Sequence, residues 1–185
     1  EKYRISDALM ATYKLIWDDF CSWLLEIVKP AYGAGIDSIT YEKVCTLFQD
    51  NLRLLHPFMP FLSEELWHAF KTRAKDEALI VSSWPSQQSM DNYLLQRFEH
   101  TAELISQLRT IRKNQNIAFK ESIQLMEATV DEISLRPIVQ KLVNVSSWEY
   151  TTTAPEQVLS FRVNAHEYFV PVSYTHLTLP TTAYV

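Results

Sequence analysis

Glycine is almost missing from this chain: only 2 of its 185 residues are glycine, at positions 33 and 35. Tight turns between neighbouring strands usually need glycine, because it adopts backbone conformations with positive φ at little cost. The chain is 47% hydrophobic and 12% aromatic, so it can still bury a sizeable core. Few turns and many apolar residues favour long helices over a fold of many strands, and we predict a mainly α fold.

The first helical pattern runs from about Tyr3 to Val28, where apolar residues recur at three-, four- and seven-residue spacings. Two such stripes lie side by side, which makes the apolar arc unusually wide. We therefore expect this helix to be covered on two sides, as in a helical bundle. Pro30 ends the pattern, and the segment that follows holds both glycines.

A second helix is predicted from about Thr40 to Leu55, with Thr40 as its N-cap. The segment HPFMPFLSEELW (56–67) then carries two prolines three residues apart. Pro57 keeps the preceding residue out of helical dihedrals, and Pro60 suits the first turn of a new helix. The sequence thus predicts that one helix ends near Leu55, that a short corner follows, and that a new helix begins at Pro60. Three bulky residues are expected to fill this corner: Phe58, Met59 and Phe61.

A third long helix is predicted from about Asp91 to Asn114, and after residue 116 the pattern changes to short alternating segments. Strands are expected over 122–127, 146–150, 159–163 and 168–171, with a short helix over 131–143. These patterns divide the chain into a helical domain over residues 1–116 and a small α+β module over residues 117–171. Residues 172–185 carry no charged side chain and resemble the translated read-through of a common DNA-library adapter, so we expect them to be a non-native tail.

Charge is unevenly distributed along the chain. The formal net charge of −5 excludes a uniformly basic nucleic-acid-binding surface, but residues 97–120 hold five basic and two acidic residues. Arg109, Arg112 and Lys113 in this segment could contact a phosphate backbone. A solubilising helix face is the alternative, and Arg112 also coincides with the apolar period of the helix.

The first helix offers a second candidate surface. An exposed aromatic residue there, such as Trp17, could stack on an unpaired base, with Lys14 contacting a phosphate. Packing of the same aromatic residues in the core is the alternative.

Catalytic constellations are not found in the sequence. The five histidines form no i,i+4 pair, Cys21 and Cys45 lack a metal-ligand spacing, and two glycines are too few for a conventional phosphate-binding loop. Adjacent carboxylates at 18–19 and 64–65 point to different helix faces, which suits them poorly to acid–base catalysis. We therefore predict no catalytic residue, metal site or cofactor in this chain, and no membrane-spanning segment.

Four motifs carry a resemblance to a known family: KLIWDDFCSWLLEIVKP (14–30), LRLLHPFMPFLSEELW (52–67), SSWP (82–85) and LRTIRKNQNI (108–117). In this order and with similar spacing they resemble the anticodon-binding domain of valyl-tRNA synthetases. The resemblance covers about residues 1–171, and the HPFMPF form of the corner favours the valyl enzymes over their isoleucyl and leucyl relatives. The segment KNQNIAFKES is less rich in proline than the usual family loop.

The resemblance implies that the chain is a fragment of a cytoplasmic, monomeric class I synthetase, which joins valine to its tRNA with ATP and Mg²⁺ and hydrolyses mischarged threonine. The catalytic and editing domains would lie outside this chain. An antiparallel helical bundle would hold the anticodon arm of a valine-specific tRNA and would adjoin the catalytic body of the same synthetase. The candidate tRNA contacts are Lys14, Trp17, Arg109, Arg112 and Lys113. The alternative is a helical protein-interaction module that binds no nucleic acid.

Overall fold

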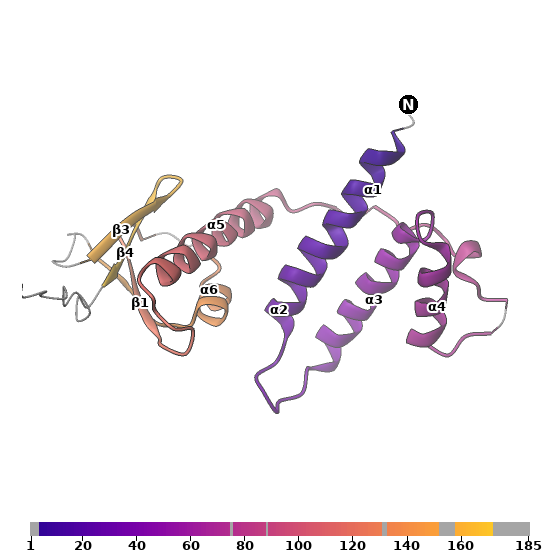
Figure 1. Cartoon of the computed structure of the whole chain (residues 1–185), viewed down its shortest axis with the longest axis horizontal. Helices are drawn as coiled ribbons and strands as arrows, with labels where there is room; N and C mark the ends of the chain where they lie inside the picture. Colours follow the sequence, from indigo (N-terminus) through magenta and orange to yellow (C-terminus); the bar gives the residue numbers. More distant parts are fainter. Residues whose placement is uncertain (1–3, 75, 88, 131–132, 152–157, 172–185) are drawn as a thin grey trace, which may run out of the picture. The chain divides into compact units, whose positions relative to one another are not determined.

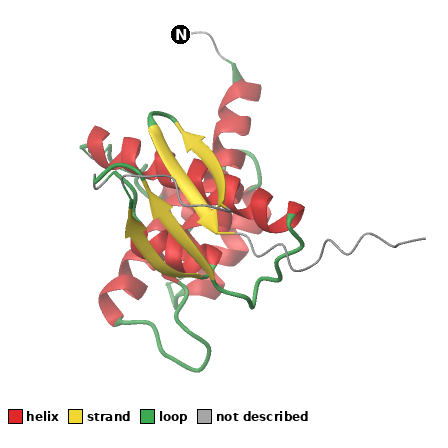
Figure 2. Ribbon diagram, turned by 90° about the vertical axis from the view of Figure 1, so that its left-hand side faces the viewer, coloured by secondary structure: helices red, strands yellow, loops and turns green. Residues whose placement is uncertain are grey.

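The structure, a computed structural model, describes residues 4–74, 76–87, 89–130, 133–151 and 158–171. Contacts within the chain divide it into two compact units, residues 1–89 and residues 90–185, and each unit is described by itself. Helices make up the regular structure of the first unit, and the second combines helices with a four-stranded sheet (Figures 1 and 2). The predicted mainly helical chain with a small α+β segment is therefore confirmed. The expected tail, 172–185, lies outside the described residues.

The first helix of the chain is built from three consecutive parts: α1 (Ile5–Lys14), η1 (Leu15–Leu24) and α2 (Leu25–Val28). The middle part, η1, is a π-helix, a wider turn that is rare and usually short. The hydroxyl of Ser22 donates to the carbonyl of Trp17, five residues earlier, at 2.8 Å. The predicted first helix is confirmed over the described residues, with a local geometry that the apolar spacing did not reveal.

The next two helices begin and end where local chemistry requires. α3 (Ser38–Leu55) has Asp37 as its N-cap, whose carboxylate accepts the N–H of Thr40 at 2.8 Å. This hydrogen bond lowers the pKa of Asp37. The expectation that Thr40 is the N-cap is therefore wrong, because Thr40 already lies inside the first turn. α4 (Pro60–Phe70) starts at the second proline of the corner, which confirms the predicted stop and restart.

The first unit is held by a small core. Three buried apolar side chains form its centre: Leu52, Trp67 and Leu79. Leu79 comes from η2 (Leu79–Val81), a short 3₁₀ turn after α4. The first helix packs against α3 through the rings of Phe20 and Phe48, whose centroids are 6.0 Å apart. A core of this size leaves much of the apolar surface of the unit uncovered.

Two expectations about burial in this unit are not met. The first helix was expected to be covered on two sides, but Ile5, Tyr13 and Trp17 are exposed. Phe61 was expected to fill the corner, but it is 91% exposed, whereas Phe58 is half-buried. Helical periodicity identifies which residues share a face, but it does not determine how many faces find a partner within the same chain.

The second unit is a mixed sheet with helices on one side (Figure 1). The strand order is β2-β1-β4-β3, where β1 and β2 are parallel and β4 is antiparallel to both of its neighbours. The strands span Ile123–Glu127 (β1), Val145–Tyr150 (β2), Val158–Val163 (β3) and His166–Pro171 (β4). The helix α6 (Arg136–Val143) connects the two parallel strands, and Asn164 makes the β3–β4 turn with a φ of 53°. All four predicted strands are confirmed.

The long helix α5 (Asn92–Asn114) belongs to this second unit. Its side chains Leu104, Ile105 and Leu108 are completely buried, and it packs against α6 and β3. The boundary between compact units therefore falls before α5, whereas the sequence placed a domain boundary after it, at residue 116. A repeating apolar pattern predicts the helix but does not show which neighbour covers its apolar face.

Several kinds of site are not built by the described residues. None of their helices has both the length and the apolarity needed to cross a membrane. No three His, Cys, Asp or Glu side chains in this part of the chain come together as metal ligands. Gly33 and Gly35 lie in an open loop, where an added Cβ would meet no atom within 4 Å.

Candidate nucleic-acid interface

The first candidate surface is the junction of α1 and η1. Trp17 is 59% exposed, and its ring stacks on that of Tyr13 with centroids 6.3 Å apart and 13° between the planes. Lys14, between them in the sequence, is also exposed, as are the carboxylates of Asp18 and Asp19. Since positive and negative groups both occur here, stacking on the rings is the stronger attraction that this surface offers to RNA.

The second candidate surface lies on the last turns of α5. Arg109 and Lys113 are four residues apart, so they share one face of the helix, and both are exposed. Within the described residues neither side chain forms an ion pair. Both cationic groups are therefore available to an anionic ligand such as a phosphate.

Arg112 lies on the buried side of the same helix. It is 5% exposed, and its guanidinium donates to the carbonyls of Ala118, Glu121, Val143 and Asn144 at 2.9, 2.8, 2.7 and 3.2 Å. Burial lowers the pKa of Arg112, although the carboxylate of Glu121 acts in the opposite direction. The expectation that Arg112 contacts phosphate is corrected accordingly, because its donors are directed at backbone carbonyls inside the protein.

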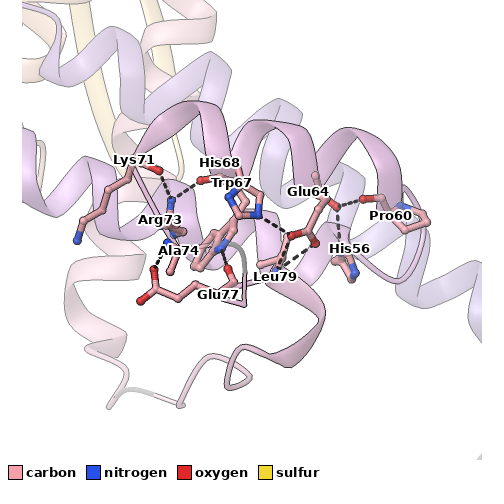
Figure 3. Close-up of polar contacts among 11 residues, drawn as sticks. His56, Pro60, Glu64, Trp67, His68, Lys71, Arg73, Ala74, Glu77 and Leu79 are labelled. Atoms are coloured by element: carbon pink, nitrogen blue, oxygen red, sulfur yellow. Dashed lines mark hydrogen bonds and ion pairs between the residues drawn. The ribbon is translucent and has the colours of Figure 1, made fainter.

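The corner between α3 and α4 is locked by polar side chains (Figure 3). The buried hydroxyl of Ser63 donates to the preceding turn at 2.8 Å and lies 2.8 Å from Nδ1 of His56. The carboxylate of Glu64 accepts the N–H of Leu79 at 2.8 and 3.1 Å and lies 3.2 Å from Nε2 of His68. These contacts tie η2 to α4 and give the corner a structural role.

Trp67 organises the loop that leads from α4 to η2 (Figure 3). Its indole N–H donates to the carbonyl of Glu77 at 3.0 Å, and the guanidinium carbon of Arg73 lies 3.7 Å from its ring centroid. Arg53 approaches the same ring at 4.9 Å, and Arg73 also donates to the side-chain oxygen of Gln49 at 2.7 Å. Burial lowers the pKa of Arg73, with the Glu77 carboxylate opposing the shift. A pocket of ≈ 350 Å³ borders this cluster.

The exposed aromatic side chain of Phe119 was not singled out from the sequence. Phe119, in the loop after α5, is 65% exposed, and the next residue, Lys120, is exposed as well. The available signal was a single aromatic residue within the otherwise polar segment KNQNIAFKES. Periodicity could not find it, because periodicity reports on the buried face of a regular element.

Comparison with known families decides what kind of domain this is. The family model described as "Anticodon-binding domain of tRNA ligase" matches residues 1–127. The chain belongs to this family. The match includes α5 and β1, so the anticodon-binding domain extends across both compact units and contains all five candidate residues named from the sequence.

Relatives of this anticodon-binding domain are valine–tRNA ligases, which confirms the resemblance carried by the four motifs. The chain is 46% identical to the enzyme of Christiangramia forsetii over 174 residues, which are 93% of the chain and 20% of that relative. It is 44% identical to the enzyme of Phocaeicola vulgatus over 172 residues, 92% of the chain and 20% of the relative. For the Bacillus cereus enzyme the identity is 28% over 186 residues, 94% of the chain and 21% of the relative. The chain thus spans about a fifth of the length of these relatives.

Proposed function

We propose that this anticodon-binding domain holds the anticodon arm of a valine-accepting tRNA, as part of a valine–tRNA ligase. The observation that carries the proposal is the family match over residues 1–127, together with the valine–tRNA ligase relatives. The geometry supports it with two exposed surfaces of suitable chemistry. Tyr13 and Trp17 offer stacked rings to an unpaired base, and Lys14, Arg109 and Lys113 offer cationic groups to phosphates.

We infer that the catalytic and editing reactions of the ligase take place in parts of the enzyme outside this chain. We infer that the ligase is a monomeric cytoplasmic enzyme, which uses ATP and Mg²⁺ to attach valine to tRNA and removes mischarged amino acids. We also infer that α1 to α4 belong to an antiparallel helical bundle in that enzyme. Binding of the anticodon arm would add affinity remote from the reacting ends and help to position the acceptor strand.

The exposed corner supports a second contact, with protein. Phe61 and Ile80 are exposed and line a pocket of ≈ 390 Å³ together with the carboxylates of Glu64 and Glu65. This pocket has two carboxylates and no lysine or arginine among the described residues that line it, so it is poorly suited to RNA, whereas its apolar groups suit a protein surface. Because the relatives are about five times as long as the aligned segment, we propose that the catalytic body of the same ligase covers this corner.

The stacking role is tested by titrating a fluorescently labelled valine-accepting tRNA with the chain and following the anisotropy. Trp17→Ala should weaken binding about 5- to 150-fold, the range expected for loss of one base–aromatic stack. Trp84→Ala is the matched control, because Trp84 is 63% exposed but lies in the loop after η2. Equal affinities of the two variants would contradict the assignment of Trp17.

The basic face of α5 is tested by the salt dependence of the same titration. Each phosphate contact contributes about 0.7–0.9 to the slope of log affinity against log salt, so Arg109→Ala/Lys113→Ala should lower the slope by about 1.5. Arg162→Ala is the control, because Arg162 is exposed but lies 3.7 Å from the carboxylate of Glu167. An unchanged slope in the double variant would remove the basic helix from the interface, whereas failure of the unaltered chain to bind tRNA would refute the function itself.

A further inference from the structure

The loop that follows α5, residues 118–121, is held by two side chains that together reach all four of its carbonyls. Arg112 donates to the first and the last of these carbonyls at 2.9 and 2.8 Å. The side-chain amide of Asn144 donates to the two middle ones at 3.0 and 3.2 Å. Asn144 has a φ of 55° and a ψ of 57°, the left-handed conformation that asparagine tolerates better than most residues. The loop is therefore fixed before any ligand arrives.

These four contacts also determine what the loop presents on its other side. The C=O and N–H of a trans peptide point in opposite directions, and the described residues include no cis peptide. The N–H groups of Phe119 and Lys120 therefore point away from Arg112 and Asn144. Neither N–H has an acceptor within the described residues. The outer side of the loop thus combines two free N–H donors with the exposed side chains of Phe119 and Lys120.

The electrostatic surroundings favour an anionic ligand. The loop directly follows the helix face that carries Arg109 and Lys113, and residues 97–120 hold five basic and two acidic residues. Glu121, the last residue of the loop, adds one exposed carboxylate, so residues 97–121 hold five basic and three acidic residues and keep a positive formal charge. The ring of Phe119 lies 6.0 Å from this guanidinium and is 65% exposed, which leaves it accessible from solvent.

We propose that loop 118–121 docks one unpaired nucleotide of an RNA. The ring of Phe119 stacks on the base, and the ammonium of Lys120 and the N–H groups of Phe119 and Lys120 bind the phosphate. The ligand is an unpaired nucleotide because bases inside a duplex are stacked on each other and offer no face to the ring. A loop already held by Arg112 and Asn144 loses little conformational entropy on binding. This proposal rests on the proposed tRNA-binding function, which supplies the RNA.

The test compares binding of a valine-accepting tRNA transcript with binding of an RNA duplex that has no unpaired base. Phe119→Ala should weaken tRNA binding about 5- to 150-fold and leave duplex binding unchanged, and Phe119→Trp should restore tRNA affinity because a ring is again present. Lys120→Ala should lower the salt slope for tRNA by about 0.7–0.9. Phe61→Ala is the matched control: Phe61 is 91% exposed but lies beside Glu64 and Glu65.

The following results would contradict the proposed role of loop 118–121. Wild-type affinity of Phe119→Ala for tRNA, or an equal loss for tRNA and duplex, would overturn the stacking role. Thermal unfolding of each variant identifies any loss caused by misfolding, which is not expected at an exposed side chain. If Trp17→Ala weakens tRNA binding and Phe119→Ala does not, the loop proposal alone falls. If the unaltered chain binds no tRNA, the proposed function falls and the loop proposal falls with it.

Discussion

The hydrogen bonds donated by Arg112 support a quantitative prediction about the stability of the second unit. Arg112 is 5% exposed and donates to four carbonyls, two in loop 118–121 and two at the end of α6, at 2.7–3.2 Å. In Arg112→Met the side chain keeps much of its apolar bulk but has no donor. All four carbonyls then lose this partner, and the link between the end of α5, the loop and the end of α6 is lost.

The expected cost follows from these contacts. A hydrogen bond to a charged group contributes about 1.5–3 kcal/mol, so four independent bonds would give about 6–12 kcal/mol. The bonds are not independent, because they share one guanidinium, and methionine also avoids the cost of burying a charge. The partners of Arg112 are neutral carbonyls, and a buried acceptor that loses its donor costs about 1–3 kcal/mol, so we expect Arg112→Met to cost about 3–5 kcal/mol in total. Such a loss is a large part of the roughly 5–15 kcal/mol that stabilises a domain.

A lysine at this position provides an intermediate case. One terminal nitrogen of Arg112, Nη2, serves three of the carbonyls, and the other, Nη1, serves the carbonyl of Ala118. An ammonium group has three donors, so Arg112→Lys can retain at most the first three contacts and should cost about 1.5–3 kcal/mol. Arg109→Met, an exposed change on the same helix, should alter the free energy of unfolding by less than about 0.5 kcal/mol.

The measurement is amide hydrogen exchange in β1 and β2, followed as a function of urea concentration. A signal from the whole chain would be less suitable, because the two compact units need not unfold together. The free energy of opening should decrease in the order wild type, Arg112→Lys, Arg112→Met. A loss below about 1 kcal/mol in the methionine variant would refute the reasoning, because it would show that water replaces Arg112 at the carbonyls at little cost.

Three further predictions concern other polar contacts. Glu64→Ala removes the acceptor of the Leu79 N–H and should destabilise the first unit by about 1–3 kcal/mol. The expected result is faster hydrogen exchange in residues 76–82, and unchanged exchange there would contradict this prediction. Tyr168→Phe removes a buried hydroxyl that contacts two other side chains and should cost about 1–3 kcal/mol in urea unfolding of the second unit, so equal midpoints would exclude this role. The pKa of Asp37 is lowered below 3.8 by the Thr40 N–H, so its charge stabilises the folded state above pH 3.8 and this contribution is lost as the pH falls through the lowered pKa. Asp37→Asn should therefore melt at a lower temperature than wild type at neutral pH but approach it in acid, and a constant difference would argue against a charge effect.

Much of the secondary structure could be predicted because its signals are local. Two prolines in HPFMPF stop one helix at Leu55 and begin the next at Pro60, since proline restricts its own dihedrals and those of the residue before it. Alternating apolar residues located all four strands. The start of α3 was misplaced because both Asp37 and Thr40 are plausible caps, and only the geometry shows which oxygen meets an N–H.

The candidate site was predictable only in part, because exposure depends on packing between distant segments. Trp17 and Phe61 are exposed because the described chain provides no partner for those faces, which the apolar pattern around them could not reveal. Phe119 is presented by a loop whose shape depends on Asn144, a residue 25 positions further along the chain.

The sequence by itself determined that the chain is mainly helical, where most of its helices and strands lie, and to which family it belongs, because dihedral preferences and motif order are properties of neighbouring residues. The tertiary structure alone decided between Arg109 and Arg112. Both are arginines at the end of one helix, three residues apart, yet one is exposed and the other donates to the carbonyl of Val143, 31 residues away. An arginine side chain becomes a structural hydrogen-bond donor or stays exposed to ligands according to which parts of the chain pack against it.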